Sequence, residues 1–334
     1  MPRRSSQRSF RQRPPLQDVN VADLPVPDNA IPGLVVRAHG LWYEVSLQAG
    51  PRASETVIAT MRGVLKKNRR RTDIVAVGDR VQVVELPDDE AAIVAIEPRT
   101  RALVRTARNT RDTEQVIVAN PDQVMFVFAI ADPEPHVRML DRFLILAEMQ
   151  GLPARIVVNK ADLDDTGIAE RIFGIYRDLY PVHLVSAATG HGIDSLREIL
   201  RGKMTVVAGP SGVGKSSLLN AIDPENLRET SAISEATGKG RHTTVGSRLY
   251  RIGEETYLAD TPGIRSIAMH AIPPEDIDRY FIELQPFLGQ CFYQDCTHVH
   301  EPDCAVKDAV VRGEIGEERY ESYVALRTGG EGSA

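Results

Sequence analysis

Two short motifs stand in an unusual order in this chain of 334 residues. Residues 159–162 read Asn-Lys-Ala-Asp, a pattern that recognises guanine bases. Residues 209–216 read Gly-Pro-Ser-Gly-Val-Gly-Lys-Ser, a complete phosphate-binding loop. In ordinary GTPases the phosphate-binding loop comes first and the base-reading motif lies far downstream. Unless both matches are accidental, the chain must fold into a circularly permuted nucleotide-binding domain.

The phosphate-binding loop lies in the sequence context that its function requires. The apolar residues 204–208 predict a strand before it, and residues 215–221 predict a helix after it. Glycines let such a loop turn its backbone N–H groups toward a phosphate at the helix N-terminus, and a ligand-free glycine-rich turn is the alternative interpretation. We expect Lys215 to contact the β- and γ-phosphates and the Ser216 hydroxyl to ligate Mg²⁺. The predicted loop residues are Gly209, Pro210, Ser211, Gly212, Val213, Gly214, Lys215, Ser216 and Ser217.

The earlier motif is predicted to select guanine over adenine. Asp162 can accept hydrogen bonds from guanine N1–H and from the exocyclic amine, whereas adenine would leave the carboxylate unpaired. Asn159 can bond to the far edge of the base, and the alkyl stem of Lys160 can lie on its face. Ala161 completes the motif. A surface turn with this composition is the alternative interpretation.

Two further motifs are expected at the ends of predicted strands. Ser186 and Ala187 follow the apolar residues 181–185, so their backbone N–H groups would lie near guanine O6. Asp260 and Gly263 belong to an Asp-Thr-Pro-Gly segment, in which Asp260 would hold Mg²⁺ through water and the Gly263 N–H would contact the γ-phosphate. Each segment alone could be an ordinary turn. Four such motifs, each at the carboxyl end of a predicted strand, indicate a single nucleotide site.

The polar, glycine-rich residues 237–244 are predicted to form a mobile switch. Either Thr243 or Thr244 would complete the Mg²⁺ shell, and the sequence does not choose between them. Many signalling GTPases place a glutamine after the glycine of Asp-x-x-Gly to orient water, but this chain has Ile264, so we expect slow intrinsic hydrolysis. A histidine in the switch is the local candidate for this role, and an inert surface histidine is the alternative. The predicted catalytic residues are His242, Lys215 and Thr244.

All three cysteines lie close together near the end of the chain. Cys291, Cys296 and Cys304, with His298 between them, offer three thiolates and an imidazole, a donor set that forms closed tetrahedral zinc sites. His300 is a spare donor that could replace His298. Three buried free cysteines are the alternative. The cluster predicts one structural Zn²⁺ that stabilises a small domain.

Composition and patterning divide the chain into four predicted parts. They are a disordered basic arm at residues 1–30, an OB-fold β-barrel at 31–105, an α/β circularly permuted P-loop GTPase domain at 106–272, and a mostly helical zinc-binding domain at 273–334. Residues 1–106 hold 17 Lys+Arg against 12 Asp+Glu, whereas residues 273–334 hold 5 against 13. The basic front, with five cations among residues 66–71, is therefore expected to meet any polyanion, although a solvated loop would have the same composition.

The composition also bears on location. The longest apolar run, residues 124–131, is too short to cross a membrane, so no membrane association is expected. Three closely spaced cysteines form a poor disulfide framework and indicate a reducing, cytoplasmic compartment. The arginine- and serine-rich N-terminus has the bias of an organelle transit peptide, but Pro14, Pro15 and the scarcity of apolar residues favour a disordered arm.

Taken together, these motifs and their order resemble the family of bacterial small-ribosomal-subunit biogenesis GTPases over about residues 30–325. The resemblance implies GTP hydrolysis to GDP and phosphate, stimulated by the small (30S) subunit, during late subunit maturation and release. It implies rRNA and the small subunit as partners of a monomer, with GTP or GDP, Mg²⁺ and one Zn²⁺ as ligands. It assigns zinc to Cys291, Cys296, His298 and Cys304.

Two other functions remain open at this point. One is an RNA-binding checkpoint module in which nucleotide only gates the conformation. The other is a P-loop small-molecule kinase, which Asp162 and the Ser186-Ala187 segment argue against, and no acceptor pocket is recognisable in the sequence.

Overall fold

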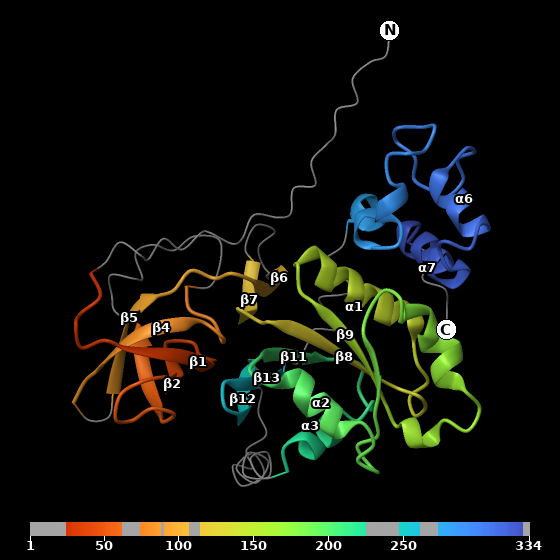
Figure 1. The fold of residues 1–334 in the computed structure, drawn as a ribbon. Coiled ribbons are helices and arrows are strands. Elements are labelled where there is room, and N and C mark those ends of the chain that lie inside the picture. The colour runs from red at the N-terminus through yellow and green to blue at the C-terminus, as the bar shows by residue number, and fades with distance from the viewer. Residues whose placement is uncertain are drawn as a thin grey trace.

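The computed structural model describes residues 25–61, 74–87, 90–106, 114–224, 247–260 and 273–329. Several predicted residues lie outside these ranges: His242, Thr243, Thr244, Gly263, Ile264, the cationic residues 66–71 and most of the basic arm. Within the described ranges the chain forms a β-barrel, a central α/β layer and a C-terminal helical unit (Figure 1). The fold class predicted from the sequence is therefore confirmed.

Five short strands close into the N-terminal barrel. They are β1 (Ile31–His39), β2 (Trp42–Leu47), β3 (Thr56–Met61), β4 (Arg80–Glu85) and β5 (Glu90–Ile96). Their order is β1-β2-β3-β5-β4, and an additional β1–β4 pairing closes the sheet on itself. Alternate side chains point inward, so Val45, Val57, Val81 and Ile93 are buried in one apolar cluster. This is the OB-like barrel that the short, alternating runs predict.

The central sheet carries the nucleotide motifs. Its strands are β8 (Gln123–Ala129), β9 (Ala154–Asn159), β10 (Val182–Leu184), β11 (Met204–Ala208), β12 (Arg248–Gly253) and β13 (Thr256–Asp260). They lie in the order β10-β9-β8-β11-β13-β12, parallel except for β12. Because β8 is buried on both faces, it reads as an unbroken apolar run rather than an alternating one.

Helices cover both faces of this sheet. They are α1 (Val137–Met149), α2 (Ile193–Leu200) and α3 (Lys215–Ile222), with short turns η2 (Ala161–Leu163), η3 (Ala169–Phe173) and η4 (Gly174–Tyr176). Phe126 and Phe128 of β8 face α1, where Phe126 stacks on Phe143, whereas Met125 and Val127 face the core shared with α2 and α3. The alternation along one strand therefore supplies two separate cores.

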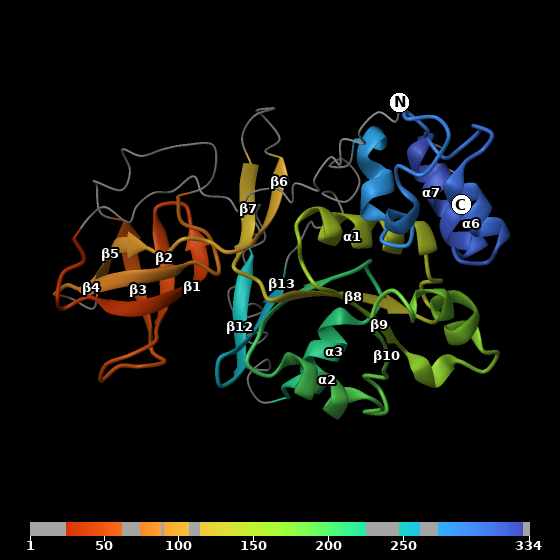
Figure 2. The same cartoon turned by 45° about the horizontal axis from the view of Figure 1, so that its top comes forward.

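The barrel and the central sheet are continuous. Strand β1 pairs with β12 through the register Arg37↔Arg248, so the two sheets form one structure of eleven strands. Figure 2 shows β12 lying between the barrel and the rest of the α/β layer. A separate hairpin of β6 (Ala102–Thr106) and β7 (Glu114–Ala119) stands beside this junction.

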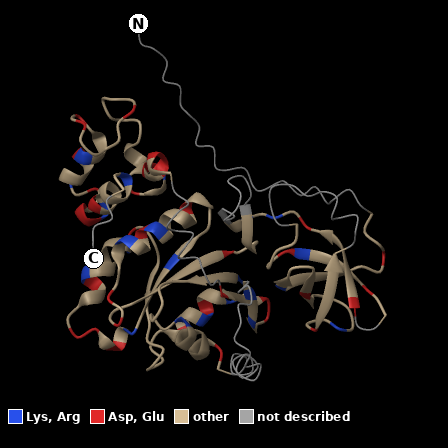
Figure 3. Cartoon of the chain, turned by 180° about the vertical axis from the view of Figure 1, so that it is seen from behind, with Lys and Arg blue, Asp and Glu red and all other residues tan. Residues whose placement is uncertain are grey.

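The C-terminal unit consists of short helical segments packed on α1. They are η5 (Pro274–Tyr280), η6 (Gln285–Phe287), α6 (Ala305–Val311) and α7 (Glu317–Arg327). Its core contains Phe281 and Tyr323, and Ile145 of α1 belongs to the same cluster. Acidic residues, coloured red on the ribbon in Figure 3, are spread over this unit. None of the helices in the described part of the chain combines the length and apolar composition that a membrane span requires.

Candidate nucleotide site and metal centre

Four of the predicted motifs meet at one edge of the central sheet. Asn159 ends β9, Ser186 follows β10, Gly209 follows β11 and Asp260 ends β13. These four strands run in the same direction, so their carboxyl ends lie on one side, where open α/β sheets bind ligands. Tertiary structure therefore brings together segments that are separated by up to a hundred residues in sequence.

Asn159 links the base-reading motif to the phosphate-binding loop and to the Ser186-Ala187 segment. Its buried side chain donates from Nδ2 to the Val213 carbonyl at 2.9 Å, and its Oδ1 accepts from the Ala187 N–H at 3.1 Å. Gly214 must be a glycine here, because it has φ +85° and a Cβ would lie 2.5 Å from the Asn159 Nδ2. Since Nδ2 carries two hydrogens, the second remains for the edge of a base.

A cavity of about 260 Å³ opens beside this link. Its lining residues are Asn159, Lys160, Asp162, Leu163, Ala187, Ala188, Gly214 and Ser217. Six of the eight are among the predicted nucleotide-binding residues. Leu163 and Ala188 are not, although each directly follows a predicted motif, and adjacency to a motif was the signal that could have found them. An apolar wall with a few polar groups is the usual composition of a base pocket.

Two contacts position the polar groups of this pocket. The Ser186 hydroxyl donates to Asp162 Oδ1, which holds the carboxylate in place while leaving its other oxygen available. The Lys160 ammonium donates to the Asp132 carbonyl, with the Lys160 backbone at φ +61°. The lysine stem therefore extends along the pocket, where its methylene groups can cover one face of a planar ligand.

The phosphate-binding loop packs closely against β8. A Cβ on Gly209 would lie 2.1 Å from the Val127 carbonyl oxygen, so only glycine fits. Lys215 donates to the carbonyls of Gly209 and Pro210 at 2.9 and 2.6 Å. Burial lowers the pKa of the Lys215 ammonium, and the Asp260 carboxylate opposes this shift. The lysine is thus held within the loop, near the position where a phosphate would lie.

Two of the residues predicted to hold Mg²⁺, Ser216 and Asp260, are exposed. Ser216 lies in the first turn of α3, and Asp260 lies at the end of β13, paired in register with Val207 of β11. Both positions lie at the edge of the sheet where the motifs gather. The remaining predicted magnesium and catalytic residues, Thr243, Thr244 and His242, lie outside the described residues.

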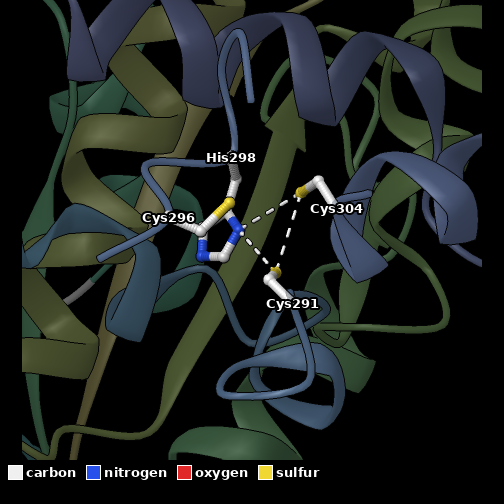
Figure 4. Close-up of side chains that lie close together, drawn as sticks. All are labelled: Cys291, Cys296, His298 and Cys304. Carbon is white, nitrogen blue, oxygen red and sulfur yellow. Dashed lines mark hydrogen bonds between the residues drawn. The ribbon is translucent and has the colours of Figure 1, made fainter. Parts of the chain in front are cut away.

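The cysteine cluster forms a second centre in the C-terminal unit (Figure 4). One ligand atom from each of Cys291, Cys296, His298 and Cys304 lies within 4.8 Å of the others. His298 Nδ1 lies 3.4 Å from the Sγ atoms of Cys291 and Cys304, which are 3.8 Å from each other. Three sulfurs and one imidazole nitrogen at such spacing fit a closed tetrahedral Zn²⁺ site.

The surroundings of this centre distinguish between the two histidines. His298 is buried, and its Nε2 lies 3.8 Å from Asp278 Oδ2, an arrangement that orients a metal-binding imidazole. The His300 side chain is 80% exposed and is not part of the cluster. Burial raises the pKa of the Cys296 thiol to about 12, because burial disfavours the charged thiolate. A bound cation would stabilise the thiolates.

The permuted order of these strands, together with a guanine-type pocket and a P-loop at one sheet edge, defines the molecule as a circularly permuted P-loop GTPase. The RsgA GTPase family model matches residues 96–270, and the chain belongs to this family of GTP-hydrolysing enzymes.

Relatives and solved structures agree with this assignment over nearly the whole chain. The protein named small ribosomal subunit biogenesis GTPase RsgA in Gemmatimonas aurantiaca is 44% identical, over 88% of this chain and 96% of that protein. The protein of the same name in Chlorobaculum parvum is 40% identical, over 90% of this chain and 98% of that protein. The crystal structure of YjeQ from Thermotoga maritima is 35% identical, with a TM-score of 0.73 over 91% of this chain and 100% of that one. The structure of YloQ, described as a circularly permuted GTPase, is 29% identical with a TM-score of 0.71 over 91% and 96%.

Proposed function

We propose that the chain hydrolyses GTP to GDP and phosphate while bound to the small ribosomal subunit, in late maturation of that subunit, and that hydrolysis leads to release. The observation that carries this proposal is the link through Asn159 between a guanine-reading pocket and the phosphate-binding loop. The names of the relatives supply the subunit as partner. We further propose that the protein acts as a cytoplasmic monomer and contacts rRNA.

Within the site, the chain's own groups have distinct proposed roles. Asp162 reads guanine and Ser186 positions its carboxylate. Lys215 leaves the two loop carbonyls for the β- and γ-phosphates, because charge-assisted bonds to phosphate are stronger than bonds to neutral carbonyls. Ser216 and a switch threonine, Thr243 or Thr244, would ligate Mg²⁺, with Asp260 acting through water. Bound Mg²⁺ would neutralise charge on the phosphates.

Hydrolysis is proposed to depend on an external trigger. Ile264 occupies the position at which many GTPases have a water-orienting glutamine, and an aliphatic side chain cannot orient water. We propose that subunit binding orders the switch and brings His242 and a switch threonine over the γ-phosphate. The isolated protein should then turn over slowly.

Turnover of GTP with and without purified small subunits tests this proposal. Small subunits should raise kcat at least about tenfold above an unassisted rate that lies well below about 1 s⁻¹. Large subunits serve as the control polyanion and should not stimulate. Equal turnover in all three conditions, with nucleotide-dependent binding retained, would favour the checkpoint module in which nucleotide only gates conformation.

The basic front is proposed to contribute to docking on rRNA. The cationic side chains of residues 66–71 lie outside the described residues, so this proposal depends on sequence alone. Substituting Lys66, Lys67, Arg69, Arg70 and Arg71 with glutamine should weaken association and flatten its dependence on salt, because fewer counterions are released. An unchanged salt slope would exclude a phosphate contact at this segment.

A further inference from the structure

Two aromatic side chains are exposed on the loop between the first two cysteines of the metal centre. Phe292 is 76% exposed and Tyr293 is 42% exposed, and their ring centroids lie 5.1 Å apart at an interplanar angle of 80°. A single exposed apolar residue is ordinary on a protein surface. Here two adjacent aromatic rings pack edge to face and both remain exposed, and aromatic side chains are enriched at protein interfaces.

The loop that carries these rings is held in a fixed conformation. The Phe292 N–H donates to the Asp303 carbonyl at 3.1 Å, and the Cys296 N–H donates to the Tyr293 carbonyl at 3.3 Å. The clustered cysteines Cys291 and Cys296 flank the loop on both sides. The aromatic pair is thus presented by a preorganised support, which lowers the entropic cost of binding a partner.

The chain segment that carries the aromatic pair is acidic, with Arg279 and Lys307 as the first basic residues on either side. Residues 280–306 contain four carboxylates and no lysine or arginine. Glu283 and Glu301 are engaged internally, by Arg319 and by Thr297. Asp295 and Asp303 are exposed, and neither belongs to an ion pair formed among the described residues. A Cys₃His centre holding Zn²⁺ would itself carry about one negative charge, three thiolates against a divalent ion.

We propose that Phe292, Tyr293, Asp295 and Asp303 form a docking surface for a lysine- or arginine-rich protein segment of the small subunit. This inference rests on the proposed function, which supplies the subunit. Both parts of the surface attract cationic side chains, which can stack on the aromatic rings and pair with the two carboxylates. Nucleic acid could stack on the rings but would bring its phosphates against the carboxylates. The C-terminal unit therefore recognises protein, and the basic front is left to contact rRNA.

Photo-crosslinking identifies what the surface touches. The full-length chain with Phe292→p-benzoylphenylalanine is bound to purified small subunits with a non-hydrolysable GTP analogue, sedimented and irradiated. The expected product is a crosslink to a ribosomal protein, within a peptide rich in lysine or arginine. A crosslink to rRNA, or no crosslink in a complex that sediments, would overturn the docking surface.

Neutralising the two carboxylates should change the affinity for the small subunit in opposite directions for a protein partner and for an RNA partner. Asp295→Asn with Asp303→Asn should weaken association if the partner is cationic protein, and should strengthen it if the partner is RNA. Asparagine suits Asp303 because it tolerates the positive φ of 52° at that position. Phe292→Ala with Tyr293→Ala should weaken association about tenfold. Val311→Ala, which alters an 87% exposed side chain on α6, is the control and should change nothing.

Two measurements distinguish a misfolded variant, a wrong docking surface and a wrong proposed function. A metal content and an unfolding midpoint equal to those of the wild type show that a variant is folded. An aromatic variant that fails this check is replaced by Phe292→Leu with Tyr293→Leu. Leucine keeps the apolar bulk but removes the aromatic faces. Wild-type protein that does not sediment with small subunits would refute both the proposed function and the docking surface. Normal sedimentation by every aromatic and carboxylate variant would refute the docking surface alone.

Discussion

Arg319 of α7 and Asp141 of α1 form a buried ion pair that joins the C-terminal unit to the α/β layer. Asp141 also accepts from Tyr176 at 2.7 Å and from the Ser322 hydroxyl, and Arg319 donates to Glu283 at 2.6 Å. The guanidinium lies 4.6 Å from the ring centroid of Phe281 and 5.2 Å from that of Tyr176. Burial alone would lower the pKa of Arg319, but Asp141 and Glu283 raise it, so the side chain stays charged.

Removing the arginine should therefore destabilise the protein strongly. Arg319→Met leaves Asp141 and Glu283 as uncompensated buried carboxylates, and we expect a loss of about 3–5 kcal/mol in the free energy of unfolding. Urea denaturation measures it. Arg201→Met removes an exposed partner of Glu198 and should leave the unfolding midpoint nearly unchanged. Equal effects of the two substitutions would show that the buried network contributes no more than a surface pair.

Asp162→Asn should change which base is bound more than it weakens phosphate binding. The amide cannot accept from both guanine donors, so the preference for GDP over ADP should fall by about 100-fold or more. The variant should gain affinity for xanthosine diphosphate, because its N–H can donate to the 2-oxo group. Isothermal titration with the three nucleotides measures both effects. Asp165→Asn alters a nearby exposed carboxylate and should behave as wild type, and retained guanine preference in Asp162→Asn would remove this residue from base recognition.

The metal centre predicts one tightly bound Zn²⁺ per chain. Elemental analysis of protein purified without added metal should find it, and Cys304→Ser should lose most of the metal and lower the thermal midpoint of the C-terminal unit. His300→Ala is the control, since its side chain lies outside the cluster and should keep the full metal content. A wild-type stoichiometry near zero with three freely titrating thiols would contradict the site.

The switch histidine should matter for stimulated turnover alone. His242→Ala should bind GTP with nearly unchanged affinity and lose most of the acceleration by small subunits, about 100-fold, because a general acid–base or water-orienting group typically contributes on that order. His191→Ala, at an exposed position after the Ser186 segment, is the matched control. If His242→Ala is stimulated as strongly as wild type, the small subunit must supply the group that orients water.

His183 should make stability depend on pH in a defined direction. Burial, with the Arg155 guanidinium adding to it, lowers the pKa of His183, whose Nε2 lies 3.4 Å from Arg155. Because the folded state binds the proton less well than the unfolded state, the contribution of His183 is fully present above about pH 6.5 and is lost as the pH falls below it. His183→Gln should reduce the loss in unfolding free energy between about pH 7.5 and 5.5. An unchanged pH profile would contradict this linkage.

The motifs of the nucleotide site and of the metal centre could be predicted from the sequence because each occupies a few consecutive residues. The phosphate-binding loop, the base-reading motif and the cysteine cluster are contiguous, and apolar runs identify the strands that precede the nucleotide motifs. The barrel followed from alternating short runs, whose period of two is a local property. The family assignment was predictable for the same reason, since the order of contiguous motifs carries it.

Contacts between distant elements were not predictable in this way. Asp141 and Arg319 each look like a surface charge on an amphipathic helix, and only packing of helices 178 residues apart buries them together. The same holds for the docking of the C-terminal unit on α1, which depends on Ile145 entering its core. No periodicity within one segment records which face another segment will cover.

By itself, the sequence determined the class of protein and the permuted order of its motifs, because these depend on residue chemistry at short spacing. Tertiary structure decided which atoms meet. It placed the Asn159 side chain against Val213, 54 residues away, and put His298 rather than His300 beside the cysteines. Such choices depend on how strands and helices pack in three dimensions, where a shift of one residue reverses the direction of a side chain.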